Sequence, residues 1–185
     1  LALILYGDMD LSVLNSLPRG RLPIKTYALE NSFHDRIYRW ILRLAAEGRQ
    51  IYMVYPLIEE GEAPGIRSAA DSYAELSRGV FRDIPCGLLH GKMTPAQKES
   101  VMRSFREGAV KILFSTTVVE VGVDVPNAVL MVIENAERFG LAQLHQLRGR
   151  VGRGTHQSYC VLFSEKITER MKIMEEVSDG FTLSE

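Results

Sequence analysis

Three arginines, Arg148, Arg150 and Arg153, lie close together near the end of the sequence. No acidic residue occurs between Gly140 and Gly154 to neutralise them. Because like charges repel at this spacing, the cluster requires an explanation. One explanation is a solvated helix C-terminus, where cations are favoured. The other is an anionic ligand, because arginine binds phosphate through two parallel hydrogen bonds and stays charged; the glycines within the cluster are unusual for a surface helix and favour phosphate.

A second candidate phosphate contact is His90-Gly91-Lys92, which follows the apolar run 86–89. The glycine lets a phosphate approach the backbone, while the histidine and lysine can donate hydrogen bonds to it. The plainer alternative is an ordinary turn between a strand and a helix. Taken alone, these residues favour the turn.

The third candidate segment runs from 115 to 126, where hydroxyl residues, among them Thr116 and Thr117, follow an apolar run. Hydroxyls at a strand end can cap the next helix or bind a phosphate there. Gly122 permits close approach of the backbone, and Asp124 can hold a ribose hydroxyl. A helix N-cap followed by a turn explains the same residues equally well, so both interpretations stay open.

Alternating strand and helix patterns surround these three segments. Strands are expected at 24–29, 50–55, 86–89, 111–115, 128–134 and 158–164, and helices at 33–47, 69–81, 95–107, 141–147 and 165–177. The alternation predicts an α/β fold, with a parallel sheet, right-handed crossovers and helices on both faces. Since ligands gather at the carboxyl ends of the strands in such sheets, we expect all three segments at that edge.

Local signals set the ends of several elements. Ser32 is expected to cap the first helix and Gly48 to end it, while Thr94 and Gln97 form a capping box. The stretch 59–68 contains acids, two glycines and a proline, which predicts a mobile loop. The last helix is expected to pack on the sheet through Ile167, Met171 and Met174.

The composition is that of an average globular chain, with 46% hydrophobic and 24% charged residues. The net charge of −1 gives no overall basic surface, so any nucleic-acid contact must be local. No secretory signal is visible, and no apolar run reaches the ~20 residues of a membrane span. Cys86 and Cys160 lack metal-ligand spacing, and reduced core thiols fit the cytosol. Both ends, Leu1 and Glu185, look like boundaries within a longer protein.

Four segments resemble motifs of superfamily 2 helicases in their order and spacing. They are residues 50–56 (motif IV), His90-Gly91 (the intervening DNA-contact motif), residues 115–124 (motif V) and residues 146–153 (motif VI). The longer runs 117–127 and 134–153 are similar to RecG-type ATP-dependent DNA helicases, as are 5–10 and 170–185. The last of these resembles the start of that family's translocation motif.

This resemblance implies a RecA-like second motor lobe, in which Arg150 and Arg153 act as arginine fingers on ATP. Arg148 falls at a position where motif VI varies. The other implied site residues are nucleotide contacts at Gln146, Gly122 and Asp124, DNA contacts at His90, Gly91, Lys92, Thr116 and Thr117, and a coupling contact at Arg170. ATP with Mg²⁺ would be bound mainly by a first lobe, because the GxxxxGK[ST] and DExH sequences are absent from this chain. The isolated chain is therefore expected to be inactive.

The implied partners are branched DNA with duplex arms, and the first lobe and DNA-wedge domain of the same polypeptide, with no membrane. The implied state is a monomer in the bacterial cytoplasm. The expected organisation is a segment following the first lobe at 1–22, the RecA-like domain at 23–164, and a truncated translocation-motif region at 165–185.

Two alternatives remain for the function. The motor of the transcription-repair coupling factor shares motif VI and the translocation motif, although the run 119–126 and Asp179-Gly180-Phe181 favour a RecG-type helicase. The other alternative is a non-catalytic RecA-like module that binds nucleic acid. The joint presence of Arg150, Arg153 and Asp124 speaks against such a module, and an upstream GxxxxGK[ST] sequence in the same reading frame would decide the class.

Overall fold

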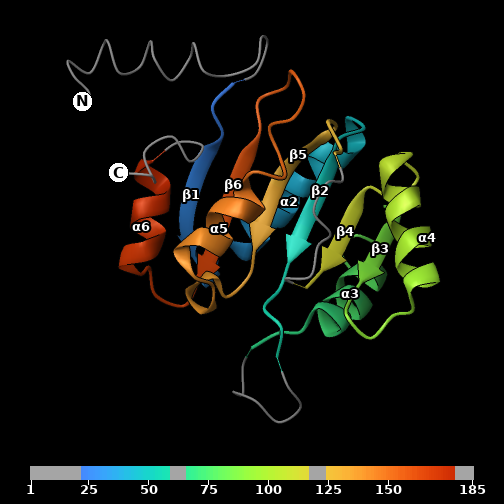
Figure 1. Ribbon diagram of the computed structural model, residues 1–185, viewed down its shortest axis with the longest axis horizontal. Helices are drawn as coiled ribbons and strands as arrows, with labels where there is room; N and C mark the ends of the chain where they lie inside the picture. Colours follow the sequence, from blue (N-terminus) through green and yellow to red (C-terminus); the bar gives the residue numbers. More distant parts are fainter. Residues whose placement is uncertain (1–21, 59–65, 117–123, 178–185) are drawn as a thin grey trace.

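A six-stranded parallel sheet forms the centre of the molecule, with strand order β1-β6-β5-β2-β4-β3 (Figure 1). The computed structural model describes residues 22–58, 66–116 and 124–177. The strands are β1 (Lys25–Glu30), β2 (Gln50–Val54), β3 (Cys86–Leu89), β4 (Ile112–Ser115), β5 (Ala128–Ile133) and β6 (Tyr159–Ser164). Every neighbouring pair in the sheet runs parallel, as the alternating sequence pattern predicts.

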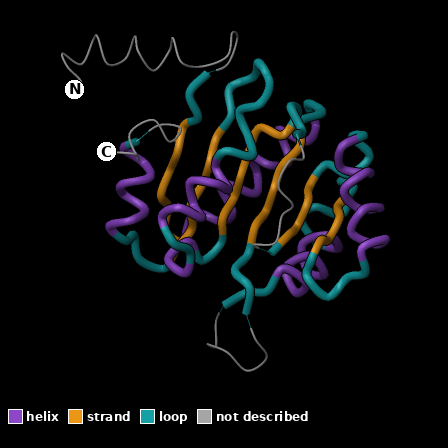
Figure 2. The backbone as a smooth tube through the Cα atoms, viewed as in Figure 1, coloured by secondary structure: helices purple, strands orange, loops and turns teal. Residues whose placement is uncertain are grey.

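Helices cover both faces of this sheet (Figure 2). On one face lie α2 (His34–Ala46) and α3 (Ala69–Arg78), which bury side chains such as Ile41 and Leu76 against the strands. On the other face lie α4 (Pro95–Arg106), α5 (Leu141–Arg148) and α6 (Glu169–Glu176). Two short 3₁₀ turns, η1 (Asn31–Phe33) and η2 (Ala136–Arg138), follow β1 and β5. The predicted α/β fold with helices on both faces is confirmed.

The burial of each strand follows its place in the sheet. All residues of the inner strands β2, β4 and β5 are buried, which explains their continuous apolar sequences. The edge strand β1 instead alternates between exposed and partly buried positions. Gln50 is the polar exception in β2, and its amide donates hydrogen bonds to the carbonyls of Phe105 (2.6 Å) and Val110 (2.9 Å). A buried amide is tolerated there because it is paired.

The helix starts confirm one of the two predicted caps. Thr94 Oγ1 accepts a hydrogen bond from the Gln97 N–H at 3.1 Å, and Gln97 Oε1 accepts one from the Thr94 N–H at 2.9 Å. The prediction for Ser32 is wrong, because Ser32 lies inside η1 and no side chain caps α2. The chain first makes a 3₁₀ turn, in which Nδ1 of His34 bonds the Asn31 carbonyl at 2.7 Å.

The last helix is shorter than predicted, because it begins only after Thr168. Thr168 Oγ1 accepts a hydrogen bond from the Met171 N–H at 3.3 Å and so caps α6. Met171 and Met174 are fully buried, as expected, while Ile167 precedes the helix and is partly buried against the same core. Residues 59–65 of the predicted mobile loop lie outside the described residues.

None of the helices in the described ranges combines the length and the apolar character that a membrane crossing requires.

Candidate functional site

Two of the three candidate segments meet at the carboxyl edge of the sheet. His90, Gly91 and Lys92 directly follow β3, and Thr116 directly follows β4, which pairs with β3. These residues line one pocket of about 360 Å³, together with residues 56–58 after β2 and 68–70 at the start of α3. The expectation that these segments lie at the carboxyl edge of the sheet is therefore confirmed for His90 and Thr116.

Thr116 lines this pocket and carries a buried polar atom. Only 8% of the residue is exposed, and its Oγ1 has no hydrogen-bond partner within the described ranges. The Thr116 N–H donates to the Leu89 carbonyl at 3.3 Å, and the Ser115 hydroxyl donates to the Thr116 carbonyl at 3.0 Å. The backbone is thus fixed, while the hydroxyl oxygen is buried and unpaired within the described ranges.

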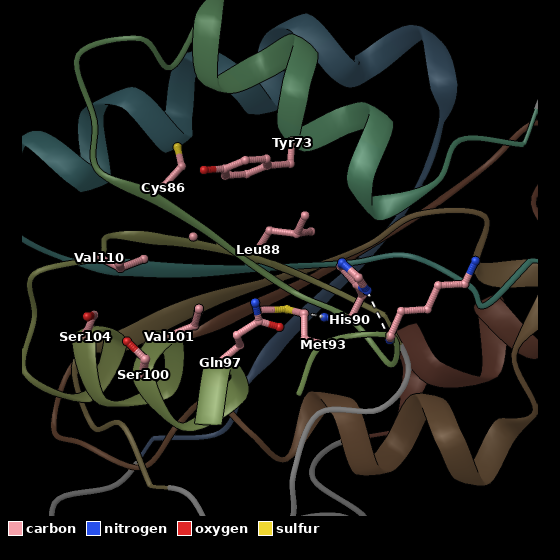
Figure 3. Close-up of a pocket in the computed structure, with 12 residues that line it drawn as sticks. Tyr73, Cys86, Leu88, His90, Met93, Gln97, Ser100, Val101, Ser104 and Val110 are labelled. Carbon is pink, nitrogen blue, oxygen red and sulfur yellow. Dashed lines mark hydrogen bonds between the residues drawn. The ribbon is translucent and has the colours of Figure 1, made fainter. Parts of the chain in front are cut away.

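His90 is held by the turn that follows β3. The Lys92 N–H donates to His90 Nδ1 at 3.2 Å, and the Met93 N–H donates to the His90 carbonyl at 3.2 Å. Since Nδ1 accepts, a neutral His90 carries its proton on Nε2 and can donate it to an anion. Figure 3 shows His90 at one end of a longer groove along the β3 edge, between Tyr73 on α3 and Gln97 on α4.

Arg148 departs from both sequence-based interpretations of the arginine cluster. It is fully buried, so it neither faces solvent nor a ligand. Its Nη1 donates to the carbonyls of Met174 (2.9 Å) and Val177 (2.8 Å) and to the Thr26 hydroxyl (3.2 Å). Arg148 therefore joins α5 to the end of α6 and to β1. The phosphate interpretation is left with Arg150 and Arg153.

Arg150, Arg153 and Asp124 lie near Tyr52, which is buried on the face of the sheet that α4, α5 and α6 cover. Arg153 is exposed; its Nε donates to the Gly149 carbonyl at 2.9 Å and lies 3.6 Å from Asp124 Oδ1. Burial raises the pKa of Tyr52 to about 12, with Asp124 adding to the rise and Arg150 and Arg153 opposing it. The three charged groups are thus close enough to act on the same phenol.

The loop that carries these arginines is not at the carboxyl edge, so the prediction that all three segments meet there is wrong. The loop follows α5 and precedes β6, and Gly154 packs against the carbonyl of Pro126, just before β5 begins. A crossover helix must return the chain to the amino ends of the strands before the next parallel strand can start. Motif VI therefore lies apart from the His90 and Thr116 pocket.

Two of the glycines in this loop, Gly152 and Gly149, differ in how strictly they are required. Gly152 has φ +80°, and a Cβ there would lie 2.9 Å from Ile24 Cγ1, so only glycine fits. Gly149 has φ −67° in the ordinary helical region, and a Cβ there would make a 3.4 Å contact with the Gln146 carbonyl. The tight passage past β1 is therefore made at Gly152.

The remaining predicted site residues are placed as follows. Gln146 is exposed on α5, and Arg170 is exposed on α6, where its Nη2 donates to the Glu137 carbonyl at 2.9 Å. Thr117 and Gly122 lie outside the described residues. Within the described ranges, no group of three histidine, cysteine or acidic residues forms a metal site.

Sequence reasoning missed a partly buried pair between His34 and Glu134 at the carboxyl edge. His34 Nε2 lies 2.9 Å from both Glu134 oxygens, and its ring stacks on Phe163 with centroids 3.9 Å apart. Burial lowers the pKa of His34, but the hydrogen bond and charge of Glu134 outweigh it, so the pKa is raised above 6.5. The available signal was an acid placed directly after the apolar strand 128–133.

The comparisons with known proteins agree with this geometry. The model of the helicase conserved C-terminal domain family matches residues 35–155. The chain belongs to this family. Over its whole length this helicase C-terminal domain is 49% identical to the ATP-dependent DNA helicase RecG of Synechocystis sp. and 50% identical to that of Bacillus subtilis. It covers 23% and 28% of these relatives, so it spans about a quarter of their length.

A solved structure, described as RecG bound to a three-way DNA junction, also matches this helicase C-terminal domain. The TM-score is 0.76 at 41% sequence identity, over 97% of this chain and 24% of that chain. The sequence-based resemblance to RecG helicases and the RecA-like lobe fold are confirmed.

Proposed function

We propose that this chain is the second motor lobe of an ATP-dependent DNA helicase that remodels branched DNA, such as stalled forks and Holliday junctions. The observation that carries the proposal is the arrangement of the site. Arg150 and Arg153 lie near Asp124, and His90, Lys92 and Thr116 line a separate pocket at the carboxyl edge of the sheet. The match to RecG helicases over the whole chain supports the same function. The intact protein would work as a monomer in the bacterial cytoplasm.

Arg150 and Arg153 would act on the γ-phosphate of an ATP·Mg²⁺ that the first lobe of the same polypeptide holds. Transfer of the γ-phosphoryl group spreads negative charge over its oxygens, and a planar guanidinium can meet two of them at once. Such arginines contribute about 10³–10⁵ in rate in well-studied systems. The Nε of Arg153 donates a hydrogen bond to the Gly149 carbonyl, which would leave its two terminal nitrogens to reach the nucleotide on the first lobe.

The other nucleotide contacts would come from the ends of motifs V and VI. Asp124 would hold the ribose, and its 3.6 Å approach to Arg153 would keep that side chain oriented before the nucleotide arrives. Gln146 on the exposed side of α5 and Gly122 would complete the contacts on this lobe. The isolated chain would not hydrolyse ATP, since phosphoryl transfer needs a phosphate cradle and a magnesium site.

The pocket at the carboxyl edge would hold the DNA backbone. His90, Lys92 and Thr116 line it, and each can donate a hydrogen bond to a phosphate oxygen. Gly91 has no side chain and would let the phosphate approach the protein backbone. Thr117 would extend the contact along the DNA strand. Backbone contacts carry no sequence information, which suits a protein that recognises the branched shape of DNA, aided by its own wedge domain.

Substitution of the two arginines in the full-length protein tests this function. Arg150→Ala and Arg153→Ala should lower DNA-stimulated ATP turnover about 10³-fold or more, while ATP binding stays largely intact. Arg150→Lys should rescue poorly, because lysine lacks the planar fork. Arg43→Ala is the matched control, because Arg43 is exposed on α2, which covers the opposite face of the sheet. This variant should hydrolyse ATP at the normal rate. Normal turnover by Arg150→Lys would refute the arginine-finger role and favour a non-catalytic module.

A further inference from the structure

One edge of the central sheet, formed by β3, has no neighbouring strand in the part of the chain that the structure describes (Figure 1). On its other side the Leu89 carbonyl accepts a hydrogen bond from the Thr116 N–H, which follows β4, at 3.3 Å. Because the backbone groups of successive strand residues point to opposite sides, those of Leu88 and Cys86 point to the open edge. Within the described ranges they have no hydrogen-bond partner, so β3 presents free N–H and C=O groups.

The opposite edge of the sheet is protected by the chain itself. The Ala28 N–H of β1 donates to Glu175 Oε2 on α6 at 2.8 Å, so a carboxylate takes the place of a neighbouring strand. Free strand edges invite pairing with other chains, and proteins commonly cover or shorten them. β3 is short, at four residues, but its edge is left open.

A groove of about 570 Å³ runs along the open edge of β3 (Figure 3). Tyr73 on α3 lies on one side of it, and on the other side α4 contributes Gln97, Ser100, Val101 and Ser104. The first side offers an aromatic ring, whereas the second offers mainly hydroxyl and amide groups. Since side chains alternate along a strand, a strand in this groove would place apolar side chains toward Tyr73 and small polar ones toward α4.

The charge in the groove has one sign. None of the described residues that line it is acidic, while Lys92 and His90 lie at the end where β3 stops. An acidic side chain at that end of a bound strand would therefore pair with Lys92, and no carboxylate of the groove would repel it.

We propose that an extended segment of a partner protein adds a strand to β3, with an acidic residue at the end beside Lys92. Backbone hydrogen bonds to Cys86 and Leu88 would give the affinity, because strand addition uses main-chain groups. Alternating side chains against Tyr73 and α4, together with the charge at Lys92, would give the selectivity.

A fluorescent peptide tests this interaction in the full-length protein, without DNA because Lys92 also lines the DNA pocket. The probe alternates valine with threonine and carries aspartate at both ends, so either orientation brings an acid to Lys92. Fluorescence anisotropy should show saturable binding, and the same probe with lysine at both ends should bind about two- to fivefold more weakly. Lys92→Glu should reverse this preference. No saturable binding, or equal binding of the two probes, would overturn the proposal.

N-methylation of the probe tests the pairing of the backbones. Alternate N–H groups of a strand face the same neighbour, so one probe is methylated on its valines and a second on its threonines. One of the two should lose binding, because its methyl groups replace the hydrogen atoms that face β3, and the other should keep it. Equal loss or equal retention would contradict an added strand.

Ser100→Trp tests the place of binding. Ser100 is exposed on α4 and lines the groove, so the indole would fill the groove and weaken binding of the probe about tenfold or more. Glu99→Trp is the matched control, since Glu99 is exposed on the same helix outside the groove, and it should bind normally. Equal affinities of the two variants would place the peptide elsewhere. Dimers of the free protein in sedimentation that Ser100→Trp abolishes would assign the edge to a second copy, and the partner segment would be refuted.

Discussion

Arg148 Nη1 donates a hydrogen bond of 2.8 Å to the carbonyl oxygen of Val177, 29 positions later in the chain. The same nitrogen bonds the Met174 carbonyl, so one guanidinium pairs with two carbonyls at the end of α6. Carbonyls at a helix C-terminus have no intrahelical partner and carry partial negative charge, which a cation stabilises. Arg148 therefore fixes α6 to the loop that carries Arg150.

Replacement of Arg148 by alanine should destabilise the fold. It would leave the buried carbonyl of Met174 and the partly buried carbonyl of Val177 unpaired and open a cavity, which should lower the free energy of unfolding by about 2–4 kcal/mol. Urea unfolding of the chain measures this. Arg150→Ala serves as the comparison, because Arg150 is only partly buried. Equal unfolding midpoints for the two variants would contradict the structural role of Arg148.

The contrast between these two arginines shows where sequence reasoning reaches its limit. Strand and helix patterns are local, so the elements and the parallel sheet could be predicted from apolar periodicity and caps. Three arginines within six residues look alike in sequence. Arg148 is buried because α6 folds back over it, and that long-range packing leaves no local signal.

The candidate site was predictable to a different degree at each end of the sheet. His90 and Thr116 each follow an apolar strand, and parallel strands that pair must bring their carboxyl ends together, so their meeting was predictable. At the other end, the crossover topology places the loop of Arg150 at the amino edge, but the approach of Asp124 to Arg153 depends on long-range packing that leaves no local signal.

The pair of His34 and Glu134 should make stability depend on pH. The folded pKa of His34 lies above its unfolded value of 6.5, so the stabilisation is fully present below pH 6.5 and is lost as the pH rises through the raised pKa. The wild type should therefore exceed His34→Gln in stability by more at pH 6 than at pH 9. Unfolding midpoints across this range measure the difference.

A second histidine provides the control for this pH dependence. His156 is exposed in the loop before β6, so His156→Gln should follow the wild-type profile throughout. Glu134→Gln removes the partner charge and should give the same flattened profile as His34→Gln. A stability difference that stays constant from acid to alkaline pH would show that His34 contributes only through packing on Phe163.

Gly152 and Gly149 should respond differently to alanine. Gly152→Ala forces a side chain into positive φ and against Ile24, which should lower the free energy of unfolding by about 1–3 kcal/mol. Gly149→Ala lies in a helical conformation and should be neutral or slightly stabilising. Thermal unfolding of both variants measures this. Similar losses at both positions would mean that the loop needs glycine for a reason other than the passage past β1.

Arg170 offers a test of how the proposed ATP turnover would be linked to movement on DNA. Its guanidinium reaches from α6 to the Glu137 carbonyl, and Arg148 holds the other end of α6 to the loop of motif VI. A shift of that loop on ATP hydrolysis would thus reach α6, which begins the region that resembles the translocation motif. In the full-length protein, Arg170→Ala should slow translocation along duplex DNA more than it slows ATP hydrolysis. Single-turnover displacement of a third strand, measured beside phosphate release, gives both rates.

Lys172→Ala on the same helix separates this role from a general loss of charge. Lys172 is exposed two positions further along α6. Its replacement by alanine therefore removes the same charge and leaves the contact between Arg170 and η2 in place. It should leave the ratio of the two rates unchanged. If Arg170→Ala lowered both rates by the same factor, the contact to Glu137 would only hold α6 in place. Coupling would then have to pass through Arg148 alone.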